Sequence, residues 1–77
     1  MANNVRMYRH LDPRDLSLED LAKLAGMPIT TLSPIELQKR DGRLKTQRKL
    51  VEALGTEGDL LFPDSPVWRL RKEARSA

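Results

Sequence analysis

Apolar residues recur at spacings of three and four along the first half of the chain, which predicts short amphipathic helices. The clearest segment is 18–25, whose apolar residues share one helical face: Leu18, Leu21, Ala22 and Ala25. Ser17 precedes this segment as a candidate N-cap, and Asp20 follows as the acid of a capping box. Gly26 comes after the last apolar position, where the helix must end and the chain must turn.

A second short helix is expected soon after this turn, with two apolar residues on its inner side, Leu32 and Ile35. If it began near residue 28, Pro34 would fall inside it, at a cost of about 3 kcal/mol. The segment from Ser33 to Glu36 instead offers a capping serine, a proline at the first helical position and a glutamate that completes a capping box. We therefore expect a late, shortened helix that starts at Ser33, with a distorted first turn over 29–33 as the alternative. Two short helices joined by a turn that contains glycine form the helix-turn-helix pattern.

Segments before and after this pattern are also predicted to be helical. Residues 3–11 form a first helix that ends before Pro13, and residues 44–54 form a fourth helix that ends before Gly55. The inward residues of the fourth helix are expected to be Leu44, Leu50, Val51 and Leu54. Thr56 is a candidate cap for a short fifth helix, after which three apolar residues are expected to close the core: Leu60, Leu61 and Phe62.

A linker at 63–66 separates these helices from a last helical segment, 67–75, which carries Val67, Trp68 and Leu70. Core packing is one interpretation of these apolar residues. A contact with a second subunit is the other, because aromatic anchors are common at interfaces. The chain is therefore expected to divide into a helical domain, 1–62, and a linker with a helical tail related to interaction, 63–77.

The 77 residues make one small domain and contain no cysteine and a single histidine, His10, which we interpret as a surface residue. This composition excludes a disulfide framework and a thiolate zinc site, and it argues against a protein-built metal centre. The sequence offers no nucleophile–base set, no phosphate-cradling glycine loop and no metal-spaced carboxylates, so we expect neither an enzyme nor a cofactor. It also lacks an apolar run of about 20 residues and an N-terminal signal core, so no membrane partner and a cytoplasmic setting are expected.

Positive charge is concentrated in one segment. The chain carries 14 basic and 11 acidic residues, a formal net charge of +3 and a pI near 9.7, which is compatible with an anionic partner. Within 39–49, only Asp41 opposes a run of basic residues: Lys39, Arg40, Arg43, Lys45, Arg48 and Lys49. Such a run is either a solvated helix face or a surface that neutralises phosphates.

An ordered set of short matches, spread over roughly 5–62, resembles the Cro/repressor-type helix-turn-helix family of XRE-like regulators. The matching residues are Leu16–Ala22, Ala25–Met27, Thr31–Ser33, Ile35–Glu36, Lys39–Asp41, Leu44 and Arg48–Gly55. The resemblance lies in the combination and its spacing, since each piece alone is unspecific. It implies an all-α, compact five-helix lambda-repressor-like domain, followed by a short C-terminal helical tail.

The resemblance also implies roles for individual residues. Groove and base contacts would come from Ile29, Thr30, Thr31, Ser33 and Pro34, and phosphate contacts from Ser17, Lys39, Arg40, Arg43, Lys45 and Arg48. Arg9 and Glu36 would pair across two helices, and the alternative is two solvated charges. Ile29 and Pro34 can contact a thymine methyl but cannot make bidentate contacts to guanine or adenine. Alternatives are core packing for Ile29 and a cap for Ser33.

The resemblance implies a sequence-specific DNA-binding transcriptional regulator, a repressor encoded by a phage or mobile element. Such proteins bind double-stranded DNA as homodimers on half-sites about one helical turn apart. A second hypothesis is a protein-interaction module, antitoxin-like or regulator-binding, that keeps the fold with weak DNA sequence reading. Three residues at the tip of the pattern motivate it, Pro28, Ile29 and Pro34, because an apolar tip suits a protein groove better than a base edge.

Overall fold

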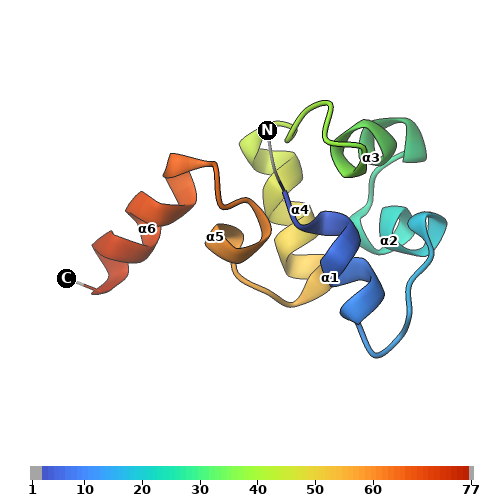
Figure 1. Ribbon diagram of the computed structural model, residues 1–77, viewed down its shortest axis with the longest axis horizontal. Helices are drawn as coiled ribbons and strands as arrows, with labels where there is room; N and C mark the ends of the chain where they lie inside the picture. The colour runs from blue at the N-terminus through green and yellow to red at the C-terminus, as the bar shows by residue number, and fades with distance from the viewer. Residues whose placement is uncertain (1–2, 77) are drawn as a thin grey trace.

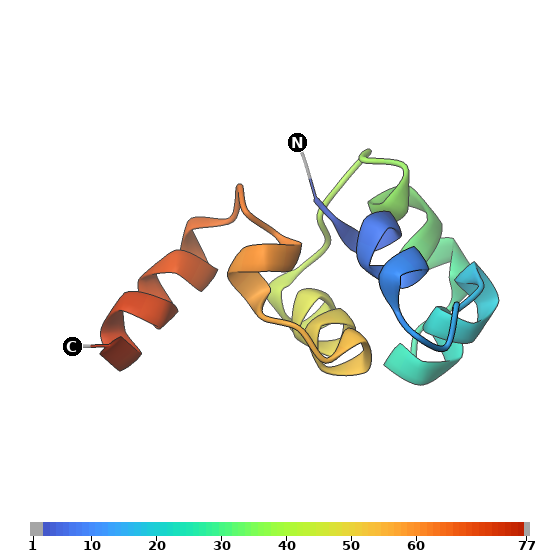
Figure 2. The ribbon, with the colours of Figure 1, turned by 60° about the horizontal axis from the view of Figure 1, so that its bottom comes forward.

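The computed structural model describes residues 3–76 and the side chains of residues 3–71. Between residues 3 and 76 it contains six helices and no strand: α1 (Val5–Leu11), α2 (Leu18–Ala25), α3 (Ile29–Glu36), α4 (Leu44–Leu54), α5 (Gly58–Leu61) and α6 (Pro66–Ser76). Figures 1 and 2 show the first five helices gathered in one group, with α6 extending from it beside α5. The all-α architecture predicted from the sequence is therefore confirmed, and none of the described helices is long and apolar enough to cross a bilayer.

The ends of α2 form as the local sequence predicts. The Asp20 backbone N–H donates to the Ser17 hydroxyl oxygen at 3.0 Å, and the Ser17 N–H donates to the Asp20 carboxylate at 3.1 Å. The hydrogen bond from the Ser17 backbone is the main cause that lowers the pKa of Asp20. At the other end Gly26 has a left-handed conformation, with φ of 67°, which glycine adopts without steric cost. Both signals depend on neighbouring residues only, so the local sequence is enough to predict the two ends of α2.

The predicted start of α3 at Ser33 is wrong. The helix begins at Ile29, with Pro28 as the N-cap residue, and Pro34 lies inside it. Neither Leu32 nor Ile35 exposes any surface, and a helical turn over 29–35 is what brings both into the core. Burying two such side chains is worth about 1.5–3 kcal/mol each, which exceeds the ~1 kcal/mol of a serine cap.

Pro34 is tolerated because its interruption falls on the outer side of α3. A proline lacks the N–H that would bond to the carbonyl four residues earlier, which here belongs to Thr30. Thr30 is exposed, so water can bind that carbonyl and the lost bond costs less than it would in the core.

The core is formed by side chains from α1, α2, α3, α4 and α5. The buried apolar residues are Val5, Leu16, Leu21, Ala22, Ala25, Leu32, Ile35, Leu50, Leu61 and Phe62. Of the four inward residues predicted for α4, Leu50 is fully buried and the others are half-buried. Leu60 was expected in the core but is 46% exposed. Since α5 is a single turn, Leu60 and Leu61 point about 100° apart, and only Leu61 faces inward.

One predicted cap is absent, and the loop between α1 and α2 makes contacts that the sequence did not predict. The N-cap of α5 is Glu57, without a side-chain cap, so the predicted capping role of Thr56 is wrong. The loop between α1 and α2 is fastened to the far end of α4. There Arg14 donates to the Ala53 carbonyl at 3.0 Å and to both carboxylate oxygens of Asp12 at 2.8 Å. The hydrogen bonds from the Arg14 side chain to Asp12, followed by the one from the Arg14 backbone N–H, lower the pKa of Asp12 to about 2.

One aromatic side chain anchors α6 to the rest of the molecule. The Trp68 indole N–H donates to the amide oxygen of Gln47 at 2.7 Å. Gln47 is only 6% exposed, and its amide nitrogen donates to the Gly42 carbonyl at 3.1 Å. The indole ring lies directly on Gly58, where an added Cβ would come within 2.0 Å of the Trp68 atoms Cδ2 and Cε3. Trp68 therefore packs within its own chain, which is the core interpretation of this residue.

Candidate nucleic-acid interface

The outer surface of α3 carries small and apolar side chains. Thr30 and Thr31 are exposed, and Ser33 and Pro34 are half-buried. Ile29 is 39% exposed, so the core-packing alternative does not describe it. Ser33 lies within the helix rather than at its start, so the capping alternative does not describe this residue either. The five residues expected at the groove thus occupy one helix, with Leu32 and Ile35 holding its opposite side in the core.

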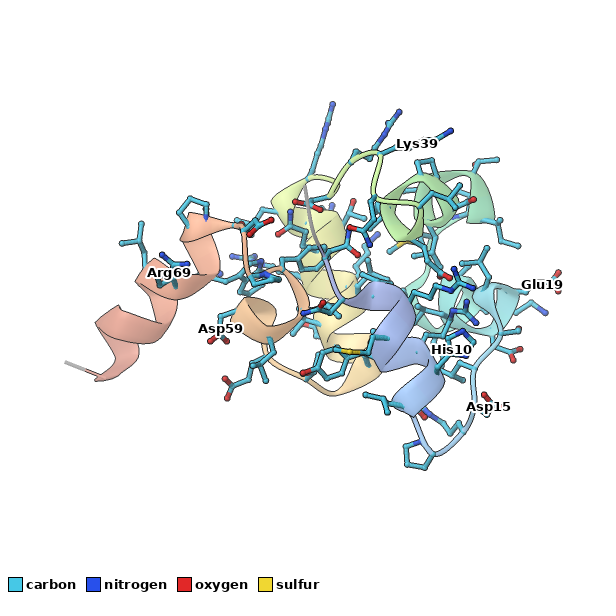
Figure 3. The ribbon with its side chains drawn as sticks, viewed as in Figure 1. His10, Asp15, Glu19, Lys39, Asp59 and Arg69 are labelled. Carbon is cyan, nitrogen blue, oxygen red and sulfur yellow. The ribbon has the colours of Figure 1, made fainter. Side chains whose placement is uncertain are left out.

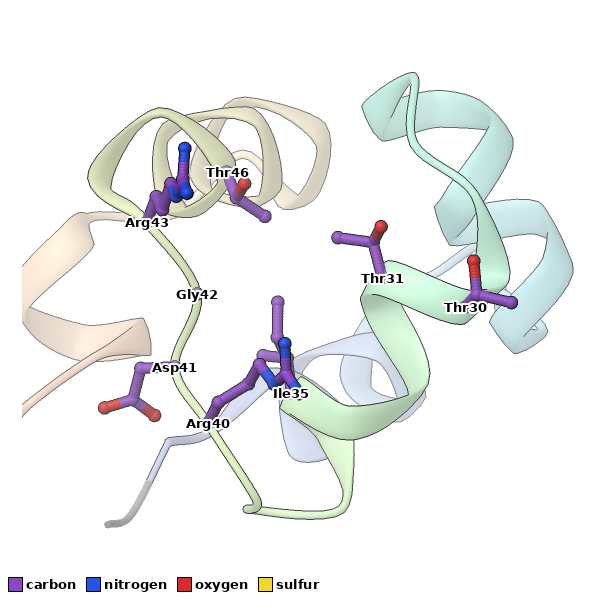
Figure 4. Close-up of a pocket in the computed structure, with 8 residues that line it drawn as sticks. All are labelled: Thr30, Thr31, Ile35, Arg40, Asp41, Gly42, Arg43 and Thr46. Carbon is purple, nitrogen blue, oxygen red and sulfur yellow. The ribbon is translucent and has the colours of Figure 1, made fainter.

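A depression of about 520 Å³ separates α3 from the start of α4 (Figure 4). It is lined by Thr30, Thr31, Ile35, Arg40, Asp41, Gly42, Arg43 and Thr46. Figure 4 shows the threonines of α3 on one side, Thr46 of α4 on another and Arg40 and Arg43 along the connecting loop. The structure therefore brings two of the predicted groove residues, Thr30 and Thr31, beside two of the predicted phosphate contacts.

Gly42 allows the loop to pass close over α3. Its φ is +80°, and a Cβ added there would come within 2.9 Å of the Ile35 side chain. The Gly42 carbonyl is held by Gln47, and the preceding Asp41 accepts a hydrogen bond from the Asn3 side chain at 3.0 Å. The only acidic side chain of the basic segment is therefore engaged with Asn3, while Arg40 and Arg43 are exposed.

The start of α4 adds positive electrostatic potential to the same loop. Arg43 is its N-cap residue and provides no side-chain cap, and the first helical bond runs from Gln47 N–H to the Arg43 carbonyl at 2.9 Å. The N–H groups of Leu44, Lys45 and Thr46 thus have no partner within the helix. A helix start with free N–H groups, flanked by arginines, is suited to an anion such as a phosphate.

The other predicted phosphate contacts are also at the surface. Lys39, Lys45 and Arg48 are exposed, and so is Ser17, whose hydroxyl oxygen caps α2. Figure 3 shows Lys39 extending away from the helices, whereas the labelled Asp15 and Glu19 lie on a different side of the molecule. His10 is exposed on α1, as expected. Within the described residues no group of three or more histidine, aspartate or glutamate side chains could hold a metal ion.

A nearly buried ion pair fixes the angle of α3 against α1. The Arg9 Nε donates to a Glu36 carboxylate oxygen at 3.1 Å, and the second guanidinium nitrogen Nη2 bonds to the other oxygen. The side chains of Arg9 and Glu36 are 11% and 10% exposed. The remaining nitrogen of Arg9 donates to the Leu16 carbonyl at 2.9 Å, which also secures the entry to α2. A bidentate pair of this kind specifies geometry more than it adds stability.

Sequence reasoning missed a second clamp on α3, between Asn3 and Gln38. The Gln38 backbone has a left-handed φ of 66° directly after α3, a position usually taken by glycine. The Gln38 amide donates to the Asn3 carbonyl at 3.0 Å and accepts from the Asn3 N–H at 2.8 Å. The Asn3 side chain donates to the Ile35 carbonyl at 2.9 Å. Two ordinary polar residues 35 positions apart carry no sequence signal for such a contact.

The three residues expected in a subunit contact are not on one surface. Trp68 is turned inward onto Gly58, whereas Val67 and Leu70 are 37% and 62% exposed. Exposed apolar residues therefore remain on α6, outside the helix group that carries the candidate interface (Figure 1).

Comparison with known proteins gives one informative match. Over 56 residues, which are 73% of this chain, 38% of positions are identical to Control protein C.SmaI of Serratia marcescens. The chain spans 64% of the length of that protein, slightly less than two thirds. No protein-family model matches the chain. No solved structure matches it significantly.

Proposed function

We propose that the chain is a helix-turn-helix protein of the Cro/repressor type and a transcriptional regulator that binds duplex DNA. Its relative is named as a control protein, which agrees with a regulatory role. One observation carries the proposal. The loop between α3 and α4 that carries Arg40 and Arg43 (the basic loop), the free N–H groups of α4 and the outer surface of α3 meet around one depression.

The parts of this surface suit different parts of a DNA duplex. Arg40 and Arg43 lie along the loop that borders the depression, where they can neutralise phosphates near the α4 N-terminus. Phosphate contacts fix the register of the protein, and α3 then faces the major groove. The ion pair of Arg9 with Glu36 holds α3 at a constant angle to the rest of the domain, as groove insertion requires.

We propose further that the protein acts as a repressor and binds as a homodimer. Val67 and Leu70 on α6 support the dimer, because apolar side chains exposed outside the core favour a partner surface. A dimer would double the phosphate contacts and match a two-fold symmetric operator. An origin in a phage or mobile element is part of the proposal that rests on the family resemblance alone.

The experiment is a salt titration of DNA binding by the double variant Arg40→Ala, Arg43→Ala. Affinity should fall for all duplexes alike, and the slope of log affinity against log salt should flatten by up to about two units, one for each phosphate that is no longer neutralised. A matched control is Arg6→Ala, Arg69→Ala, which removes the same charge from α1 and α6. If the two double variants give the same slope, the basic loop does not contact DNA.

A protein-interaction module remains the second candidate, and exposed apolar residues favour it. Leu37 is 60% exposed at the end of α3, and Ile29 is 39% exposed at its start. A protein groove would bury these side chains completely, which is favourable in free energy. DNA offers a comparable apolar contact only at thymine methyl groups. Absence of salt-dependent binding to any duplex would favour this candidate over a DNA-binding regulator.

A further inference from the structure

The bases that α3 can recognise are limited by which of its side chains are already engaged. Within residues 29–38, only Glu36 and Gln38 carry a carboxylate or an amide, and none is arginine, lysine or asparagine. Both of these groups are used inside the protein. Arg9 occupies the two carboxylate oxygens of Glu36, and Asn3 pairs with both ends of the Gln38 amide.

The side chains that remain on the outer surface of α3 present methyl groups, ring methylenes and hydroxyls. They belong to Ile29, Thr30, Thr31, Ser33, Pro34 and Leu37. Bidentate hydrogen bonds to guanine or adenine need a guanidinium, an ammonium or an amide, so this helix cannot form them. A hydroxyl can bond to any of the four bases and therefore discriminates poorly.

One feature of the major groove does match such a surface. Thymine differs from the other bases by the C5-methyl group that it presents there, and apolar side chains contact it. Methylated cytosine presents a methyl group on the same ring atom, so a surface that recognises the methyl by burial does not distinguish the two. The exposed cations around α3, including Lys39 and Arg40, would hold this apolar strip against the groove between the phosphate rows.

We propose that α3 reads C5-methyl groups, so that the preferred ligand is duplex DNA rich in thymine or 5-methylcytosine at the contacted positions. The inference rests on the proposed function, because it assigns the ligand chemistry of the same surface. Ile29 and the Thr30 methyl group carry the recognition, since both lie in the exposed first turn of the helix. Cytosine methylation of an operator would then strengthen binding at positions where thymine is tolerated.

The test uses a pool of random short duplexes in four versions that differ only in C5-methyl groups. The pool contains thymine or uracil, combined with cytosine or 5-methylcytosine, and binding is measured by anisotropy competition. Removing one methyl group that α3 buries should weaken binding about fourfold, the equivalent of ~0.8 kcal/mol for one buried CH₂ group. Uracil should therefore weaken binding, and 5-methylcytosine should restore it in the pool that lacks thymine.

Two variants and a control assign the effect to α3. Thr30→Ser removes one methyl group and keeps the hydroxyl, and Ile29→Ala removes most of the apolar side chain. Both should bring the affinities of the four pools closer together. The control Thr56→Ser makes the same chemical change between α4 and α5 and should leave the ratios unchanged.

The possible results separate this inference from the proposed function. Equal affinity for the four pools, with strong salt dependence retained, would overturn methyl recognition and leave DNA binding intact. A preference that follows guanine content and disappears in Arg40→Ala, Arg43→Ala would also overturn it, because the loop rather than α3 would then read the bases. Failure to bind any of the pools would contradict the proposed function itself.

Discussion

Replacing Gly58 by alanine should destabilise this protein, although the same change at a helix start usually does the opposite. Gly→Ala normally stabilises by ~0.4–1 kcal/mol, because it reduces the entropy of the unfolded chain. Here the added Cβ would lie 2.0 Å from two atoms of the Trp68 ring, far inside van der Waals contact. The indole N–H bonds to Gln47, so displacement of the ring weakens or breaks that hydrogen bond.

The expected destabilisation by Gly58→Ala has two sources, overpacking of the Trp68 ring and loss of its hydrogen bond. Overpacking costs typically about 1–3 kcal/mol, and an unsatisfied buried acceptor on Gln47 costs about 1–3 kcal/mol more. Trp68 can avoid part of this cost by swinging outward together with α6. We therefore expect Gly58→Ala to lower the free energy of unfolding by about 2–4 kcal/mol, after subtraction of the ordinary gain.

Urea unfolding followed by circular dichroism measures the effect, and the variant pair Gly58→Ala and Trp68→Ala provides the control. In the Trp68→Ala background no ring opposes the Cβ, so Gly58→Ala should be neutral or stabilising by ~0.4–1 kcal/mol. The two single changes should thus show a strong coupling energy in a double-mutant cycle. If Gly58→Ala is as stable as the wild type with Trp68 in place, the reasoning about the Trp68–Gly58 contact is refuted.

Three further predictions concern α3 and the loop before α2. Pro34→Ala should raise the free energy of unfolding by about 1–2 kcal/mol, because the regained helical bond outweighs the entropic advantage of proline, and an unchanged melting temperature would contradict this. Glu36→Ala should cost about 1–3 kcal/mol, and a double-mutant cycle with Arg9→Ala should give a clear coupling energy rather than one near zero. The pKa of Asp12 is lowered from 3.8 to about 2, so its contribution to stability is present at neutral pH and lost as the pH falls through that range. Acid titration of stability should therefore show wild type and Asp12→Asn converging at low pH, and a constant difference would exclude this role.

The parts of the fold that the sequence predicts are those decided within a few residues. Ser17, Asp20 and Gly26 set both ends of α2, because a capping box and a left-handed glycine need only their neighbours. The same local reasoning fails at α3. Ser33 and Pro34 form a good helix start in isolation, but the core requires Leu32 and Ile35 on one helical face, and that burial decides the outcome.

The candidate site likewise combines residues that could be named before the structure was known with contacts that could not. The cations and threonines could be named from the family resemblance, and the structure places Thr30, Thr31, Arg40 and Arg43 at the surface. The contacts that orient them could not be named in this way. Gln38 contacts Asn3, 35 positions away, and Trp68 donates to Gln47, 21 positions away, and nothing in these residue types indicates the partner. Such pairings are fixed by tertiary packing rather than by local preference.

The single tryptophan of the chain is also a built-in optical probe of the interface. Its indole N–H bonds to Gln47, and the same amide group of Gln47 holds the Gly42 carbonyl, two residues from Arg40 and next to Arg43. A shift of that loop when a ligand docks would change the polarity and hydrogen bonding at Trp68, and hence its emission wavelength. Ligand binding at the loop and movement of α6 can thus be followed in the unlabelled protein, by one signal and without an engineered fluorophore.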